Sequence, residues 1–266
     1  MECLAQHGLS HPQSYRITDK NELLQLSAKG GSWVLKPVHS RFSQQIFFDP
    51  GPTEIEPLDV SENHPWVLQQ RIIGRQICTY SVVQRGIISG HVAYTSLLAR
   101  GAGAGVACES LDHDACFQWV SEFVKKTNFH GQISFDFIED DNGVPYVIEC
   151  NPRATTGAFF LSYEPDAATL FLGSGEPFIK ARPGTKIINK TIAKLMRWEK
   201  RGDKKERRRI QQISKQCSDY YASRDDPRPR LWRLLCIPSI LREARRQKMD
   251  IETLTTYRSI YDGTAL

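Results

Sequence analysis

An acidic turn between two alternating apolar runs constrains this chain more than any other stretch. Apolar residues alternate over residues 133–137 and again over 146–150, and the sequence DDNG at 140–143 separates the two runs. Such alternation is typical of half-buried strands, and Asn-Gly between two of them is a strong hairpin signal. The stretch 131–157 therefore predicts an antiparallel β-hairpin with its loop centred on Asn142-Gly143.

Counting outwards from this loop places Asp140 opposite Pro145 and Asp136 opposite Glu149. Directly opposed residues have Cβ atoms about 4.5–5.5 Å apart, and like charges there destabilise the strand pair. A divalent cation is the simplest compensation. Asn151 points to the same face as Glu149 because side chains alternate, and carboxylate and amide oxygens suit Mg²⁺ or Mn²⁺. The pattern predicts a metal site of Asp136, Glu149 and Asn151.

Arg153 shares this face if the strand continues, and its planar guanidinium suits phosphate or carboxylate oxygens. The alternative is an acidic surface hairpin whose carboxylates only hydrate one face of the sheet. Because the register, the Asn and the Arg agree with one another, we favour the metal site.

The segment YVIECNPR at residues 146–153, with Asp136 one strand earlier, resembles the metal-binding end of the ATP-grasp superfamily. That superfamily includes carbamoyl phosphate synthetase, biotin carboxylase and D-alanine ligase. Its members hold there the magnesium ions that bridge ATP phosphates. The resemblance implies this role for Asp136, Glu149 and Asn151, and contact with phosphate or substrate for Arg153. It also implies an α+β fold of two lobes with mainly antiparallel sheets and ATP between them.

Lys36 lies in an apolar run, VLKP, within a strand expected at residues 32–38. A lysine there often lies at a strand edge with its charge in water. However, VLKP resembles the ATP-grasp strand whose lysine meets the nucleotide phosphates, which implies a catalytic and ATP-binding role. The next loop lacks the glycines common in that family. We expect Ser40, Arg41 and Ser43 side chains to replace the missing backbone contacts; the alternative is a lid that does not close tightly.

Residues 66–76 resemble the hinge of the family, whose backbone meets the adenine edge. The family usually has Glu near Gln70 and again at the position of Gln76. Glutamine can still accept a ribose hydroxyl, because its amide has an acceptor as well as donors. The resemblance therefore implies nucleotide contacts by Gln69, Gln70 and Gln76, with an altered affinity.

Arg100 opens the run RGAGAG. A Gly/Ala repeat is commonly a flexible linker. In related ligases, however, a strand-end arginine followed by glycines lines the acceptor and γ-phosphate site. The resemblance makes Arg100 a candidate catalytic cation.

Two further stretches predict helices. Residues 112–127 place apolar side chains on one face, which indicates a helix that packs on a sheet. Residues 158–172 predict a second helix, ended by Gly173.

The positive charge is concentrated in the C-terminal part. From Lys194 onward there are 19 Lys and Arg against 10 Asp and Glu, whereas the rest has 16 against 20. We expect residues 1–190 to form the two lobes, with a hinge near 66–76, and residues 191–266 to form a basic, mostly helical extension. Residues 232–242, with basic residues on both sides, fit contact with an anionic membrane surface or a partner, but we favour a helix packed on the main body or on a missing domain.

Several features favour a cytoplasmic protein. The chain has 7 cysteines without a C-x-x-C pair, which indicates reduced thiols. It has no apolar run long enough to span a membrane, and its first residues lack a secretory pattern.

The resemblance implies an ATP- and magnesium-dependent ligase. Such an enzyme phosphorylates a small carboxylate substrate to an acylphosphate, and an amine or similar nucleophile then displaces the phosphate. Many members carry another α/β domain before the first lobe, whereas this chain begins almost at the lobe. We therefore expect a fragment, an acceptor site completed by another chain, or a chain that has lost ligase activity.

The alternative function is a non-catalytic ATP-binding or scaffold protein, a truncated ATP-grasp chain whose basic tail holds a partner or a membrane. Nucleic-acid binding through the tail would show steep salt dependence. We do not favour it, because the sequence has no evident aromatic platform for single strands.

Overall fold

A computed structural model of the chain describes residues 4, 6–39, 45–100, 104–171, 178–221 and 228–249. The described residues divide into two compact units. The first unit contains the described residues of Met1–Gln13, Arg71–Arg100 and Ala104–Ser218, and the second those of Ser14–Gln70 and Asp219–Leu266. Both units combine helices with mainly antiparallel strands, which confirms the α+β prediction.

The second unit contains a four-stranded sheet in the order β1-β4-β2-β3. Its strands and helices are β1 (Ser14–Ile17), α2 (Lys20–Ala28), β2 (Trp33–Pro37), β3 (Phe47–Phe48), α3 (Pro52–Ile55) and β4 (Trp66–Gln70). Asp19 caps α2, because its carboxylate accepts a 2.9 Å hydrogen bond from the Glu22 amide. The buried side chains of Leu23, Leu35 and Leu68 form the centre of its core. The strand predicted around Lys36 is therefore present as β2.

Helix α8 (Arg228–Gln247) also belongs to the second unit. Two of its large side chains are exposed, Trp232 by 63% and Leu235 by 67%. Contact with a membrane surface or partner through this segment stays a prediction. Among the described residues, no helix combines the length and apolar character that crossing a bilayer requires.

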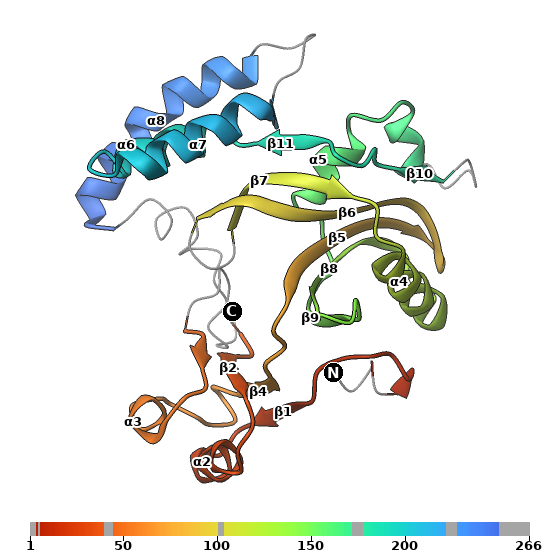
Figure 1. The fold of residues 1–266 in the computed structure, drawn as a ribbon, viewed down its shortest axis with the longest axis vertical. Coiled ribbons are helices and arrows are strands. Elements are labelled where there is room, and N and C mark those ends of the chain that lie inside the picture. The colour runs from red at the N-terminus through yellow and green to blue at the C-terminus, as the bar shows by residue number, and fades with distance from the viewer. Residues whose placement is uncertain are drawn as a thin grey trace. The chain divides into compact units, whose positions relative to one another are not determined.

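The first unit is built on an eight-stranded sheet in the order β12-β11-β7-β6-β5-β8-β9, with β10 paired to β6 (Figure 1). The short β10–β6 pair is parallel, and the pairs that link β11, β7, β6, β5, β8 and β9 are antiparallel. The strands are β5 (Arg75–Gln84), β6 (Ile87–Arg100), β7 (Ala104–Leu111), β8 (Gly131–Glu139), β9 (Pro145–Asn151), β10 (Ile179–Lys180), β11 (Lys186–Ile188) and β12 (Ser218–Asp219).

Helix α4 (Asp114–Thr127) covers one face of this sheet, as its amphipathic pattern predicts. Trp119 is the centre of the contact: its ring lies 5.1 Å from that of Phe135 and 5.2 Å from that of Phe137, both edge-on. Such aromatic clusters contribute large buried areas to a core. Helices α6 (Lys190–Glu199) and α7 (Lys204–Gln216) pack on a second cluster that includes Leu98 and Val106.

The opposite face of the sheet carries α5 (Gly157–Leu161) and the 3₁₀ helix η1 (Ala167–Phe171). The single helix predicted over residues 158–172 is therefore wrong. Pro165 explains the break, because proline lacks an amide donor and disfavours helical backbone at the residue before it. Asp166, with a φ of 59°, then turns the chain into η1.

Gly157→Ala is expected to destabilise the protein by about 1–3 kcal/mol, the usual range for overpacking. A Cβ at Gly157 would lie 2.2 Å from Cβ of Tyr80, so α5 would have to move away from β5. Urea denaturation measures the loss. Gly202→Ala is the matched control, because nothing lies within 4 Å of the added carbon there; equal stability of the two variants would contradict the close packing of α5.

Candidate active site

The acidic hairpin is formed by β8 and β9, but its loop differs from the prediction. Asp140 accepts a 3.0 Å hydrogen bond from the Gly143 amide, and the Asp140 amide donates to the Val144 carbonyl at 3.1 Å. The loop therefore has three residues, 141–143, with Gly143 at a φ of 77°. Glu139, not Asp140, lies opposite Pro145. The predicted register is thus wrong by one residue at the loop.

A β-bulge in β9 restores the register further along. Phe137 lies opposite Val147, but Asp136 lies opposite Glu149, so that Ile148 is the extra residue. The predicted pairing of Asp136 with Glu149 is therefore confirmed, although two irregularities that offset each other produce it. The bulge also places Val147 in the core, where the alternating pattern predicts Ile148.

The acidic pair lies on the face of the sheet opposite to α4. Ile77, Phe135 and Phe137 point into the α4 core, so their neighbours in the strands point the other way. Cys78 lies opposite Asp136, and Asp136 opposite Glu149. Three adjacent strands thus place these side chains in one row.

A chain of hydrogen bonds extends the row along β9. The Asn151 amide nitrogen Nδ2 donates to Glu149 Oε1 at 3.0 Å, and Arg153 Nη2 donates to Asn151 Oδ1 at 3.0 Å. Turning the Asn151 amide over would direct its oxygen towards Glu149, because the group has an acceptor and donors on opposite sides. The prediction that these three side chains gather with Asp136 agrees with this geometry.

The oxygen donors of Asp136, Glu149 and Asn151 fit Mg²⁺, which keeps water and phosphate ligands. They fit a metal ion whose ligands all come from the protein less well. In the part of the chain that the structure describes, no three His, Cys, Asp or Glu side chains form a metal-binding group. Two carboxylates and one amide oxygen leave coordination positions for water and phosphate oxygens, which is the usual arrangement for Mg²⁺ at nucleotide sites.

Further side chains, which were not predicted from the sequence, lie on this face of the sheet. Thr155 Oγ1 lies 2.9 Å from Ser134 Oγ and 3.3 Å from Tyr94 Oη. Ser134 lies two residues before Asp136, so strand alternation could have found it. Cys78 and Tyr94 could not be found in this way, because they lie on β5 and β6, whose register with the hairpin is set by long-range pairing.

The Cys78 thiol stays protonated beside the acidic pair. Burial raises the pKa of Cys78 well above its usual value, and the neighbouring Asp136 carboxylate, with which it shares a hydrogen bond, raises it further. A protonated thiol is a poor nucleophile. Cys78 therefore belongs to the wall of the site.

In the second unit, Lys36 is held by a chain of hydrogen bonds. Lys36 Nζ donates to Gln69 Oε1 at 3.1 Å, and Gln69 Nε2 donates to Ser14 Oγ at 3.1 Å. Gln69 is 4% exposed, whereas Gln70, at the end of β4, is exposed. Lys36 and Gln69, each predicted to contact the nucleotide, are thus adjacent. Ser40 and Arg41 lie outside the described residues.

The other two predicted site residues belong to the first unit. Gln76 is exposed on β5 and shares its face with Cys78. Arg100 Nη2 pairs with Glu199 Oε1 at 2.9 Å. Arg100 lies six residues along β6 from Tyr94, which pairs with Cys78, and this corresponds to about 20 Å of strand. The structure therefore does not bring Arg100 to the acidic pair.

The glycine-rich run after Arg100 is not a linker where the structure describes it. Ala104 and Gly105 begin β7 and pair with Arg100 and Ala99 of β6. This part of the run therefore continues the sheet.

Comparison with known proteins connects these features to one family. The family model described as an ATP-grasp domain matches residues 1–157. No curated protein sequence matches the chain.

Several solved structures share the fold at low sequence identity. Phosphoribosylamine–glycine ligase from Thermotoga maritima has a TM-score of 0.57 at 14% identity, over 70% of this chain and 55% of that one. Carboxyaminoimidazole ribonucleotide synthase from Aspergillus clavatus, complexed with ATP, has a TM-score of 0.57 at 12% identity, over 71% and 54%.

The biotin carboxylase domain of 2-oxoglutarate carboxylase from Hydrogenobacter thermophilus, in complex with MgADP and bicarbonate, has a TM-score of 0.55 at 15% identity, over 70% and 47%. The chain thus spans about half the length of these three structures. Since the family model covers more than half of the chain, this protein belongs to the ATP-grasp family.

Proposed function

We propose that this protein binds ATP with Mg²⁺ and uses it to join a carboxylate to an amine. The observation that carries the proposal is the direct opposition of Asp136 and Glu149, extended by Asn151 and Arg153 through hydrogen bonds of 3.0 Å. Two carboxylates on adjacent strands repel each other, and a bound cation would relieve this repulsion. The guanidinium of Arg153 beside them suits phosphate oxygens. The ATP-grasp membership agrees with this assignment.

Each group has a separate task in this proposal. Asp136, Glu149 and Asn151 would hold Mg²⁺, and the bound ion would neutralise part of the negative charge of the ATP phosphates. Arg153 would bind phosphate or the substrate carboxylate. Lys36, directed by Gln69, would bind phosphate oxygens.

The remaining predicted residues have less support. Nucleotide contacts by Gln70, Gln76, Ser40 and Arg41 stay predictions. The ion pair between Arg100 and Glu199 offers a structural role for Arg100, and a catalytic role would require that pair to open.

The proposed reaction has two steps. A carboxylate oxygen of the first substrate attacks the γ-phosphorus of ATP, which forms an acylphosphate and releases ADP. The amine nitrogen then attacks the acyl carbon, phosphate leaves, and the nitrogen loses a proton as the amide forms. Phosphoryl transfer depends mainly on positioning and on charge stabilisation, so no serine or cysteine nucleophile is needed.

The test is ADP release in the presence of magnesium, ATP and a panel of carboxylic acids and amines. The proposal requires a pair of substrates that releases ADP faster than either substrate alone and yields an amide detectable by mass spectrometry. ATP binding without ADP release for any pair would instead favour the non-catalytic ATP-binding alternative.

Lys36→Met is expected to weaken ATP binding about tenfold or more while adenosine binding stays unchanged. A hydrogen bond to a charged group is worth about 1.5–3 kcal/mol, and adenosine lacks the phosphates that Lys36 would contact. Calorimetric titration with both ligands separates the effects. Lys29→Met, on the exposed end of α2, is the matched control; an equal loss for ATP and adenosine would remove Lys36 from the phosphate site.

A further inference from the structure

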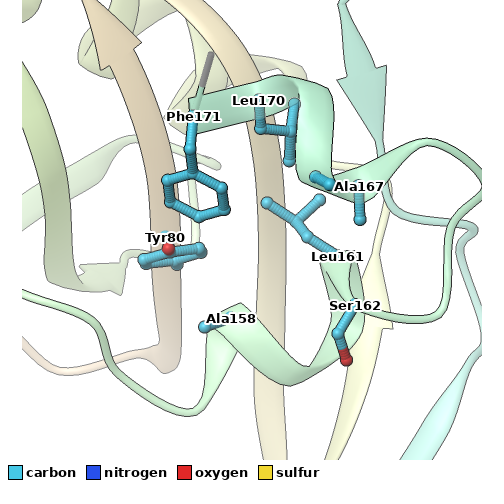
Figure 2. Close-up of a pocket in the computed structure, with 8 residues that line it drawn as sticks. Tyr80, Ala158, Leu161, Ser162, Ala167, Leu170 and Phe171 are labelled. Carbon is cyan, nitrogen blue, oxygen red and sulfur yellow. The ribbon is translucent and has the colours of Figure 1, made fainter.

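A cavity of about 180 Å³ lies between β5 and the α5–η1 segment. Figure 2 shows the rings of Tyr80 and Phe171 on one side of it and the side chains of Leu161 and Leu170 on the other, with Ala158 below. The remaining wall is formed by Ser162, Ala167 and Ala168. The cavity is open on one side, and the part of it that the protein lines consists mainly of carbon atoms.

The polar atoms of this wall already have partners. Tyr80 Oη donates to Gln132 Oε1 at 2.6 Å, and Ser162 Oγ donates to the Phe159 carbonyl at 2.7 Å. A ligand group inside the cavity would not need to satisfy either hydroxyl. The wall therefore suits an apolar group, because a polar one would lose its hydrogen bonds to water without replacement.

The size of the cavity selects among apolar groups. An apolar cavity of about 150 Å³ accommodates benzene in a well-studied engineered protein, so about 180 Å³ suits a phenyl ring or a branched aliphatic group. Phe171 is 56% exposed although it lines the cavity. A bound group would cover part of this apolar surface.

The cavity shares its face of the sheet with the acidic pair. Tyr80 lies two residues from Cys78 on β5 and opposite Ser134, and Ser134 lies two residues from Asp136 on β8. Two residues of a strand correspond to about 7 Å. This separation is comparable to the distance from the carboxylate carbon to the far edge of the ring in an extended 3-phenylpropionate.

We propose that this cavity receives the apolar side group of the carboxylic acid that the enzyme activates. The inference rests on the proposed function, because the acid must present its carboxylate to the γ-phosphate near Asp136 and Glu149. It adds a substrate class: acids with a phenyl or branched aliphatic group about two carbons from the carboxylate. The amine partner would approach the acyl carbon from outside the cavity.

The experiment measures binding of 3-phenylpropionate, acetate and 2-phenylethylamine by calorimetry or saturation-transfer NMR, with Mg-ATP affinity measured in parallel. We expect 3-phenylpropionate to bind at least about tenfold more tightly than acetate, since an apolar pocket discriminates by this order. Ala158→Leu, which fills the cavity, should weaken 3-phenylpropionate about tenfold and leave Mg-ATP affinity unchanged.

Two further variants keep the test decisive. Phe171→Ala removes an exposed part of the wall and should also weaken 3-phenylpropionate, even if Ala158→Leu fails to fold. Ala28→Leu, on the exposed end of α2, adds the same group elsewhere and should change nothing.

The contrary outcomes separate the two proposals. Equal affinity for acetate and 3-phenylpropionate, or tight binding of 2-phenylethylamine alone, with Mg-ATP still bound, would overturn the cavity assignment and leave the nucleotide site intact. If wild-type protein binds no Mg-ATP, the proposed function fails, and the assignment of the acid as its substrate fails with it.

Discussion

In Glu149→Gln, magnesium-dependent ATP binding is expected to fall about a hundredfold or more, equivalent to roughly 2.8 kcal/mol. Glutamine keeps the length of the side chain and an oxygen that can accept from Asn151. It removes the negative charge opposite Asp136, so the two strands no longer present a pair of carboxylates to the cation. The loss of ATP affinity should therefore result from weaker magnesium binding, not from a change in the structure of the hairpin.

Calorimetric titration of ATP with and without magnesium measures this effect. Wild-type protein should show a strong dependence on magnesium, and Glu149→Gln should bind ATP with similar weak affinity in both conditions. Asp141→Asn removes a carboxylate from the exposed loop of the same hairpin and is the matched control. Unaltered magnesium-dependent binding by Glu149→Gln would locate the metal elsewhere.

The stability of the protein is expected to fall steeply as the pH drops below about 6.5, because of His91. The His91 side chain is 1% exposed, its Nδ1 lies 2.8 Å from Ser81 Oγ, and the ring packs edge-on against Phe117. Among the described residues, no group bonds to its Nε2. Burial, with smaller electrostatic contributions from Lys180 and His113, lowers the pKa of His91 from 6.5 to about 3.

The direction of the effect follows from proton linkage. The unfolded chain binds a proton at His91 below pH 6.5, whereas the folded protein binds it only near pH 3. The contribution of the neutral His91 side chain to the free energy of unfolding is thus fully present above pH 6.5, and it is lost progressively as the pH falls towards 3. At about 1.4 kcal/mol per pH unit, the total loss approaches about 5 kcal/mol, a large part of the stability of a typical domain.

Urea denaturation of wild type and His91→Gln at pH 7 and pH 4.5 tests this prediction. The wild type should lose about 3 kcal/mol more than the variant between the two pH values, because glutamine does not titrate. The carboxylates titrate in both proteins, so comparing the two slopes removes their contribution. His130→Gln, at an exposed position, should retain the wild-type slope. Parallel slopes for wild type and His91→Gln would show that His91 can be protonated in the folded protein.

Much of the candidate site could be predicted because its signals are local. Glu149, Asn151 and Arg153 follow one another at every second position, so strand alternation alone places them near one face. The Asn-Gly turn predicts that β8 returns as β9. However, the sequence did not reveal the three-residue loop or the bulge at Ile148. The pairing of Asp136 with Glu149 was predicted correctly only because these two deviations offset each other.

The contacts of two other predicted residues, Arg100 and Lys36, join distant segments of the chain. The ion pair that holds Arg100 joins β6 to Glu199, and the bond that directs Lys36 joins β2 to Gln69. Contacts of this kind depend on the register of whole strands and on packing. Patterns over a few neighbouring residues carry no information about either.

The acidic hairpin and the amphipathic α4 could be predicted from local patterns, because turn residues and hydrophobic periodicity act over a few neighbouring positions. The α+β class was implied by the resemblance of the hairpin segment to the ATP-grasp superfamily. Three features could be seen only in the folded protein: the face of β5 that meets the acidic pair, the break of the predicted helix after Leu161, and the cavity beside Tyr80. The first feature depends on the register between β5 and β8. The other two depend on the packing of α5 and η1 against strands far away in the chain, and the energy of such packing depends on shape complementarity in three dimensions.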